Sequence, residues 1–242
     1  MANWFTYDWL DKGEPARYAV DLALGERASA ETYPFVFRLY CTAPGDMSGR
    51  CRRHAEALLS KCLKEGFLLA GRVDTNTRAL FYFYGKAKVS LASIEYAYAK
   101  EKLLTCRADV QEDPSWSFYG EQLCPDAAKY QTEQNREMIE RMRKAGDYTP
   151  AARRVRLHMF FPSEPLLSMF SQAARQAGFA LSDTQFYPDM ERAYGIAIIK
   201  ICTLNKPDVD ALTTGAIYLA QNYDGTLLYW DAPVVPKHSP LR

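Results

Sequence analysis

The order of the predicted helices and strands constrains the fold most strongly, because the same order occurs twice along the chain. In the second half, residues 153–161 alternate between apolar and polar side chains and predict a strand, and a segment with helical periodicity then ends at Gly178. Two more predicted strands, a helix that Pro207 opens and a last strand follow. The resulting order, β-α-β-β-α-β, is that of the ferredoxin-like, or split βαβ, arrangement.

The first half gives the same order after an additional N-terminal hairpin, NWFTYDWL and ARYAVDLAL. Its second predicted helix covers residues 90–103. A common phrase accompanies the first helix of each half: the letters LLS lie in the helix and the letters GF follow its end. The phrase covers residues 58–69 in the first half and 166–181 in the second. We therefore predict an α+β protein that contains two tandem ferredoxin-like (βαββαβ) units of one repeated topology.

A predicted linker helix joins the two units. Its apolar positions form a narrow stripe, and it begins next to Pro125 and ends before Gly146. The expected boundaries are residues 1–122 for the first unit with its hairpin, 123–147 for the linker helix and 148–242 for the second unit.

The stretch EDPSWSFYGEQLCPDAAKY precedes and enters this helix. An Asp-Pro step favours a turn at Asp113 and Pro114. Trp116 and Tyr119 are three residues apart and can cover one apolar surface while their polar atoms find hydrogen-bond partners. We interpret these four residues as a structural clasp that holds the linker helix to the first unit. A loop that presents its aromatic rings to a ligand is the alternative.

Both central sheets are predicted to be apolar on two faces, although the helices of such a unit cover only one. Residues 81–84 of the first unit are FYFY, and residues 196–201 of the second are IAIIKI. RNA-recognition domains of this topology stack bases on the bare face, but their basic, glycine-rich signature is missing from these strands. We therefore expect the bare faces to meet each other or a second copy in a homo-oligomer, and at least one to be covered within the chain.

The net charge of +1 gives no global attraction to nucleic acid or to a membrane, so neither is an expected partner. One segment still carries a local excess of positive charge, because residues 141–156 are rich in Arg and Lys. Such a run is usually a solvated helix end followed by an edge strand. A site for an acidic protein segment or RNA is the alternative. The candidate partner-binding residues in this run are Arg141, Arg143, Arg153, Arg154 and Arg156.

The sequence contains no GxSxG, HExxH or phosphate-binding glycine motif. The six cysteines form no CxxC pair and the three histidines lie far apart, so we expect no metal, cofactor or catalytic site. Cys41 and Cys106 fall among alternating apolar residues, where a thiol is buried and unreactive. Such thiols, the absence of a signal-peptide pattern and the absence of a long apolar run predict a cytoplasmic protein.

Two parts of the chain resemble known bacterial families. EDPSWSFYGEQLCPD, the pattern N…MI…GD from Asn135 to Asp147, and the following RRV and HMFFP resemble the domain-of-unknown-function family numbered 695. The segment from FSQAARQAGF through YGIAIIKI to YWDAPVV is similar to the regulator of ribonuclease E, inhibitor B family. The last strand of that family has Tyr-Asp-Gly-Trp-Glu, where this chain has Leu-Leu-Tyr-Trp-Asp at residues 227–231.

The second resemblance implies a ferredoxin-like domain that binds a ribonuclease and modulates it without chemistry of its own. We therefore expect a non-enzymatic regulatory or adaptor protein whose partner is another macromolecule, in the first place a ribonuclease. Tyr229 and Trp230 of the last strand join the candidate partner-binding residues. The alternative is a small-molecule-binding protein or an enzyme that uses the cleft between the two units.

Overall fold

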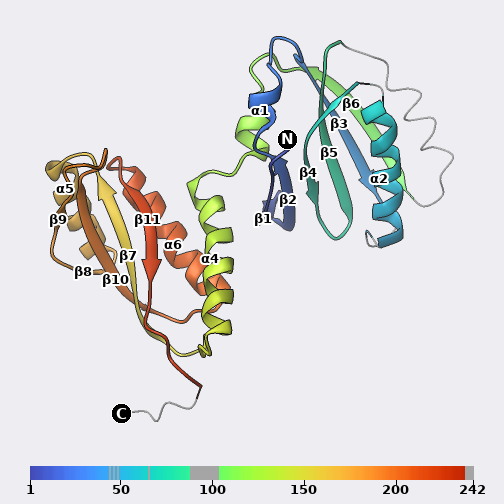
Figure 1. Ribbon diagram of the computed structural model, residues 1–242. Helices are drawn as coiled ribbons and strands as arrows, with labels where there is room; N and C mark the ends of the chain where they lie inside the picture. The colour runs from blue at the N-terminus through green and yellow to red at the C-terminus, as the bar shows by residue number, and fades with distance from the viewer. Residues whose placement is uncertain (44, 46, 48, 65, 88–103, 238–242) are drawn as a thin grey trace. The chain divides into compact units, whose positions relative to one another are not determined.

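The computed structural model describes residues 1–43, 45, 47, 49–64, 66–87 and 104–237. The helix expected at residues 90–103 lies outside this part of the chain. The chain divides into two compact units, Met1–Pro125 and Asp126–Arg242 (Figure 1). It is an α+β protein with two antiparallel sheets, one in each unit, of six and five strands.

The first unit is built on the six-stranded sheet, whose strand order is β1-β2-β4-β5-β3-β6. The elements are β1 (Trp4–Asp11), β2 (Glu14–Asp21), α1 (Leu24–Arg27), β3 (Phe35–Thr42), α2 (Gly49–Lys64), β4 (Leu68–Asp74), β5 (Arg78–Gly85), β6 (Thr105–Glu112) and a π-helical turn (Phe118–Leu123). The expected N-terminal hairpin is β1–β2, and it extends the sheet because β2 pairs with β4.

Both faces of the first sheet are covered within the first unit. On one face, Phe81 and Phe83 belong to a core cluster that includes buried residues of α2. On the other face, Tyr82 and Tyr84 pack in a cluster with buried tyrosines of β1 and β2 and with the ring of Trp116. Because side chains alternate along β5, its phenylalanines pack in the core on one face of the sheet and its tyrosines pack in the core on the other. The expectation of a second face covered within the chain is confirmed for this unit.

The second unit is built on the five-stranded sheet, in which the order is β11-β7-β10-β8 and β9 also pairs with β10 (Figure 1). The elements are α4 (Ala127–Lys144), β7 (Arg153–Phe161), α5 (Glu164–Gln176), β8 (Ala180–Leu181), β9 (Gln185–Phe186), β10 (Tyr194–Cys202), α6 (Lys206–Gln221) and β11 (Thr226–Asp231). The helix expected as the linker between the units is α4, and its contacts place it within this unit, where it packs along α6.

A buried asparagine explains why α4 packs there. The Asn135 amide nitrogen donates to Asp210 Oδ1 at 2.9 Å and to Thr213 Oγ1 at 2.8 Å, both on α6. The Asn135 amide oxygen accepts a hydrogen bond of 2.7 Å from Trp230 Nε1 on β11. Ile139 and Met142 of α4 also enter the core of the unit. One satisfied polar side chain and a short apolar stripe therefore fix the helix.

The helices of the second unit cover only one face of its sheet. Val155, Leu157 and Met159 of β7 belong to the core cluster that α5 and α6 complete. The intervening Arg154 and Arg156 are exposed, as alternation along a strand requires. The opposite face of the sheet therefore carries the side chains that the unit's own helices leave uncovered.

Candidate partner-binding surface

The Asp113 carboxylate organises the turn that follows β6. Asp113 is buried and accepts hydrogen bonds from the Tyr84 hydroxyl at 2.6 Å, from the backbone N–H and hydroxyl of Ser117 at 2.8 and 2.7 Å, and from the backbone N–H of Phe118 at 3.1 Å. Burial disfavours the charge, but these hydrogen bonds outweigh it and lower the pKa of Asp113. Pro114 lies exposed at the turn. The turn is therefore built around an ionised carboxylate.

Trp116 and Tyr119 close this turn over the first sheet. Trp116 Nε1 donates to the Tyr33 carbonyl at 2.8 Å, and its ring centroid lies 4.8 Å from that of Tyr84. The Tyr119 hydroxyl donates to the Asp21 carbonyl at 2.7 Å. All these partners belong to the first unit, so the clasp holds the turn after β6 against other parts of that unit. This differs from the expected clasp, which was to hold α4.

Replacing Asp113 with Asn is expected to lower the free energy of unfolding by about 2–3 kcal/mol at neutral pH, because an amide leaves buried donors unpaired. The lowered pKa sets the sign of the pH dependence. Stability from the ionised carboxylate is fully present above the ordinary Asp value of 3.8 and is lost as the pH falls through the folded pKa. Urea unfolding at a series of pH values should show a steeper acid-side loss for the wild type than for Asp113→Asn.

The matched control for this experiment is Glu112→Gln, which removes a neighbouring carboxylate that is exposed. It should leave both the stability at neutral pH and the acid-side slope unchanged. Wild-type stability of Asp113→Asn at neutral pH would contradict the organising role of the carboxylate.

The uncovered face of the second sheet combines charged and apolar side chains. The residues that we define as the open face are Arg154, Arg156, His158, Phe160, Ile199, Ile201, Tyr229 and Asp231. Strand register places them together, because Ile201 pairs with Arg154 and Tyr229 pairs with His158, and directly opposite residues share a face. Ile201 is 71% exposed and Tyr229 is 50% exposed. Large apolar groups are thus presented to solvent beside arginines.

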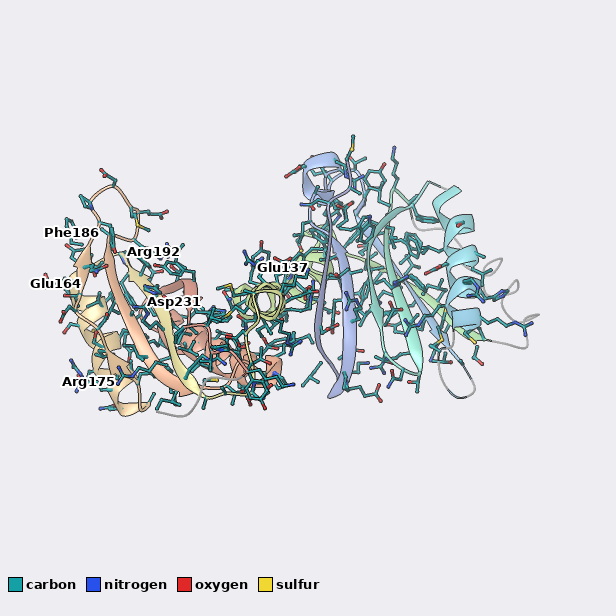
Figure 2. The ribbon with its side chains drawn as sticks, turned by 60° about the horizontal axis from the view of Figure 1, so that its bottom comes forward. Glu137, Glu164, Arg175, Phe186, Arg192 and Asp231 are labelled. Carbon is teal, nitrogen blue, oxygen red and sulfur yellow. The ribbon has the colours of Figure 1, made fainter. Side chains whose placement is uncertain are left out.

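A polar network joins β7 to β11 on the open face. Asp231, labelled in Figure 2, accepts a hydrogen bond of 2.8 Å from Arg156 Nε, and its other carboxylate oxygen lies 2.7 Å from His158 Nε2. The His158 ring stacks on the Tyr229 ring, with a centroid distance of 4.2 Å and an interplanar angle of 16°. These contacts hold the exposed Tyr229 ring in one orientation. A preordered aromatic side chain loses little entropy when it binds a partner.

A hollow is lined in part by two residues of this network. It has a volume of about 200 Å³, and its lining includes Arg156, His158, Phe160, Tyr187 and Ile199. The rings of Phe160 and Tyr187 lie 5.5 Å apart. The lining therefore combines aromatic rings with charged groups, which suits the docking of a partner side chain.

The structure places the four exposed arginines of the predicted basic run in three settings. Arg154 and Arg156 lie on the open face. Arg141 is exposed and lines a separate groove of about 290 Å³ between α4 and β11, together with Tyr229. Arg143 lines a different hollow on α4, away from β11. Two of the predicted arginines therefore share the open face, and Arg141 borders it through Tyr229.

Arg153 and Trp230 do not lie at the surface. The Arg153 side chain is 3% exposed, forms an ion pair with Asp147, and donates to the carbonyls of Tyr148 at 2.6 Å and Pro233 at 3.0 Å. Trp230 is 4% exposed in the core. Both side chains hold the second unit together, which differs from the expected partner-binding role, and we leave them out of the candidate surface.

Sequence reasoning missed His158 and Asp231. His158 lies in the middle of a predicted strand, where the sequence favours a structural role, and neither His158 nor Asp231 is among the sequence-based candidates. The alternation of residues 153–161 was a usable signal, since it places His158 on the same face as Arg154 and Arg156. The pairing with Asp231 depends on the register between β7 and β11, which local sequence does not reveal.

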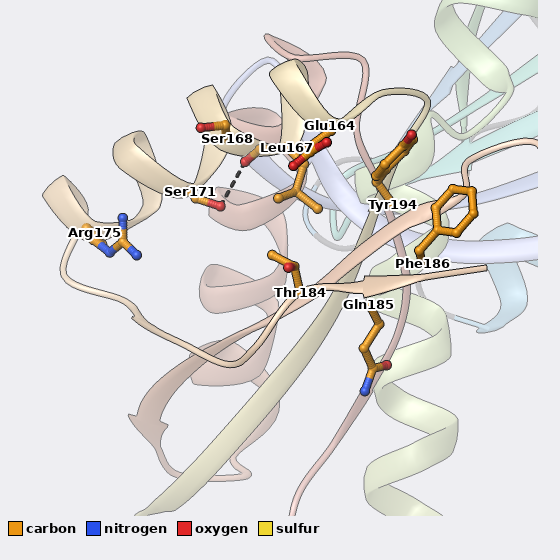
Figure 3. A pocket seen from close by; sticks show the side chains of 9 residues that line it. All are labelled: Glu164, Leu167, Ser168, Ser171, Arg175, Thr184, Gln185, Phe186 and Tyr194. Atoms are coloured by element: carbon orange, nitrogen blue, oxygen red, sulfur yellow. Dashed lines mark hydrogen bonds between the residues drawn. The ribbon is translucent and has the colours of Figure 1, made fainter. Parts of the chain in front are cut away.

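A second hollow lies at the other edge of the sheet, between α5 and the β9 segment (Figure 3). Its volume is about 540 Å³. Glu164, Ser168 and Arg175 line it from α5, and the rings of Phe186 and Tyr194, 5.0 Å apart, line one end. The lining therefore offers both charged groups and an aromatic surface to a small ligand.

Two kinds of feature are absent from the described residues. Within those ranges, no group of three or more His, Cys, Asp or Glu side chains is arranged to hold a metal ion. No helix in the same part of the chain combines the length and the apolar character needed to cross a membrane.

Comparison with known proteins gives one family match. Residues 132–231 match the family model described as Regulator of ribonuclease activity B (RraB) and form a domain of that type. The match begins within α4 and ends at the last residue of β11, so it covers the open face. No family model matched the N-terminal region, and the resemblance there to the family numbered 695 stays a prediction. A search of curated proteins found no match.

Proposed function

We propose that this protein is a non-enzymatic regulator that binds a ribonuclease through the open face of its second unit. The family match carries this proposal, because the matched region is a domain described as a regulator of ribonuclease activity. The open face supports it, since a binding domain needs a surface that its own core does not use. The N-terminal unit is an additional part of the chain, and the proposal assigns the contact to the second unit alone.

The chemistry of the open face suits a protein partner with acidic segments. Protein interfaces combine buried aromatic and arginine anchors with a polar rim. Tyr229 and Ile201 supply exposed apolar area and Arg154 supplies positive charge, while the charge of Arg156 is already paired with Asp231. Arg141, in the neighbouring groove, adds a further cation beside Tyr229. Their positive charges would pair with carboxylates of the partner.

The proposal includes a ferredoxin-like topology for both units. In the second unit, the order β11-β7-β10-β8, with α5 and α6 in the two connections, is the order of a split βαβ sheet. In the first unit, β4-β5-β3-β6 follows the same scheme once the N-terminal hairpin is set aside. An antiparallel sheet of this kind leaves one face for binding when helices cover the other.

The direct test uses ribonuclease E, the enzyme that the sequence resemblance points to, and a short single-stranded RNA substrate. The purified full chain should bind the enzyme in a calorimetric titration and should change the rate at which the RNA is cleaved. Absence of both effects would overturn the proposal for this enzyme. A mobility shift of the RNA by the chain alone, without the enzyme, would instead favour a base-stacking role for the open face.

Ile201→Glu is expected to weaken binding to ribonuclease E by at least about tenfold, because it removes exposed apolar area from the open face and places a carboxylate opposite Arg154. Met169→Glu is the matched control, since Met169 is an exposed apolar residue on α5 and is 55% exposed against 71% for Ile201. Equal affinities of the two variants would remove the open face from the proposal. Thermal melting of each variant checks that both remain folded.

A small-molecule-binding function is the second candidate, and the hollow between α5 and β9 favours it. Its volume of about 540 Å³ lies within the usual range of ligand sites. Arg175 and the Phe186–Tyr194 ring pair would suit a planar ligand with an acidic group. A thermal-shift screen of such compounds, repeated with Arg175→Ala, tests this candidate because a bound ligand stabilises the folded state.

A further inference from the structure

Two cysteines lie directly opposite each other at the edge of the first sheet. Cys41 of β3 and Cys106 of β6 are paired in the strand register. Their sulfur atoms are 3.1 Å apart. Directly opposite residues of antiparallel strands have Cα atoms about 4.5–5.5 Å apart, which falls within the range of about 4.4–6.8 Å that a disulfide needs. A bond between them therefore requires side-chain adjustment without rearrangement of the strands.

The two cysteines differ in their exposure to solvent. Cys41 is fully buried in the core cluster under α2, and Cys106 is half-buried on β6, the last strand of the sheet. An oxidant therefore reaches Cys106 first, and Cys41 stands behind it as the resolving thiol. The contact with Cys41 and burial raise the pKa of the Cys106 thiol, so this thiol is protonated at neutral pH and reacts slowly.

We propose that Cys41 and Cys106 form a reversible disulfide, which makes this strand pair a redox modification site that takes a low-molecular-weight disulfide such as glutathione disulfide. Cys106 loses its proton and attacks one glutathione sulfur, so one glutathione leaves and a mixed disulfide forms. Cys41 then loses its proton and displaces the second glutathione from Cys106. Two protein thiols are oxidised by two electrons, and one glutathione disulfide is reduced to two glutathiones.

The bond would act on the stability of the first unit. It joins positions that are 65 residues apart in sequence, and closing a long loop removes conformational freedom from the unfolded chain. It would also fix the start of β6 to β3, and β6 is the strand whose far end leads into the turn that Asp113 organises. This effect lies in the first unit and does not depend on the binding function proposed for the second.

The test equilibrates the full chain with glutathione buffers, from mostly reduced to mostly oxidised. Of the six thiols, two should be lost together, and mass spectrometry of tryptic peptides should map one bond between Cys41 and Cys106. The thermal midpoint of the first unit should rise by roughly 5–10 °C on oxidation and return on reduction. Below the pKa of the attacking thiol, the rate should increase about tenfold for each pH unit.

Single variants separate the proposal from general thiol oxidation. Cys41→Ser should leave Cys106 as a stable mixed disulfide with glutathione and abolish the rise in thermal midpoint. Cys202→Ser, which removes a half-buried thiol of the second unit, should leave the Cys41–Cys106 bond intact. Six thiols that stay reduced in the most oxidising buffer would overturn the proposal, as would a bond that maps to another pair.

Discussion

Trp116→Ala is expected to lower the free energy of unfolding of the first unit by about 3–5 kcal/mol, the usual cost of emptying a buried aromatic site. Trp116 is 7% exposed, and its ring lies 4.8 Å from Tyr84 and 5.8 Å from Tyr119. Removing the ring leaves a cavity between these two tyrosines and takes away the donor to the Tyr33 carbonyl. Urea unfolding, followed by circular dichroism, measures the change.

Two further substitutions identify the cause of the loss. Trp116→Phe keeps an aromatic ring but removes the N–H donor, and it should cost distinctly less than the alanine variant. Trp116 has a φ of +55°, which strains any residue with a Cβ, so Trp116→Gly should be no less stable than Trp116→Ala. An alanine variant as stable as the wild type would contradict the clasp and favour the alternative of a ligand-facing loop.

Much of the fold could be predicted because its signals are local. The FYFY sequence of β5 places aromatic rings on both faces of the first sheet, and both faces are covered by core clusters. The position of α4 could not be predicted in the same way. It depends on Asn135, whose amide contacts Thr213 on α6 and Trp230 on β11. A polar residue with distant partners gives no hydrophobic periodicity to detect.

The candidate surface shows a similar division. The run of basic residues in the sequence placed Arg153 and Arg154 in one candidate site. Side chains alternate along β7, however, so the two arginines lie on opposite faces of the sheet. The irregularity between Leu227 and Tyr229 in β11 has a larger effect. Beyond that bulge, Tyr229 pairs with His158 and Trp230 pairs with Leu157, so the tyrosine is exposed and the tryptophan is buried. Without the extra residue, Leu228, the rings of Tyr229 and Trp230 would exchange faces of the sheet. No local sequence pattern predicts this bulge.

Arg153→Ala is expected to lower the free energy of unfolding of the second unit by about 3–5 kcal/mol, because it breaks a buried ion pair and leaves one charge uncompensated. Its partner Asp147 has a side chain that is 0% exposed. The Asp147 carboxylate also accepts the backbone N–H of Val235 at 2.9 Å, and Arg153 donates to the Pro233 carbonyl at 3.0 Å. The pair therefore connects the segment after α4 to the segment after β11. Urea unfolding measures the loss.

Arg154→Ala is the matched control, because Arg154 is the neighbouring arginine and is exposed on the open face. It should change stability by less than about 0.5 kcal/mol and act only on binding to the ribonuclease. The double variant Arg153→Met with Asp147→Leu removes both charges and should be more stable than Arg153→Ala, because no uncompensated charge remains buried. If Arg153→Ala instead keeps wild-type stability and loses affinity for the ribonuclease, Arg153 belongs to the binding surface, as its position in the basic run of the sequence first indicated.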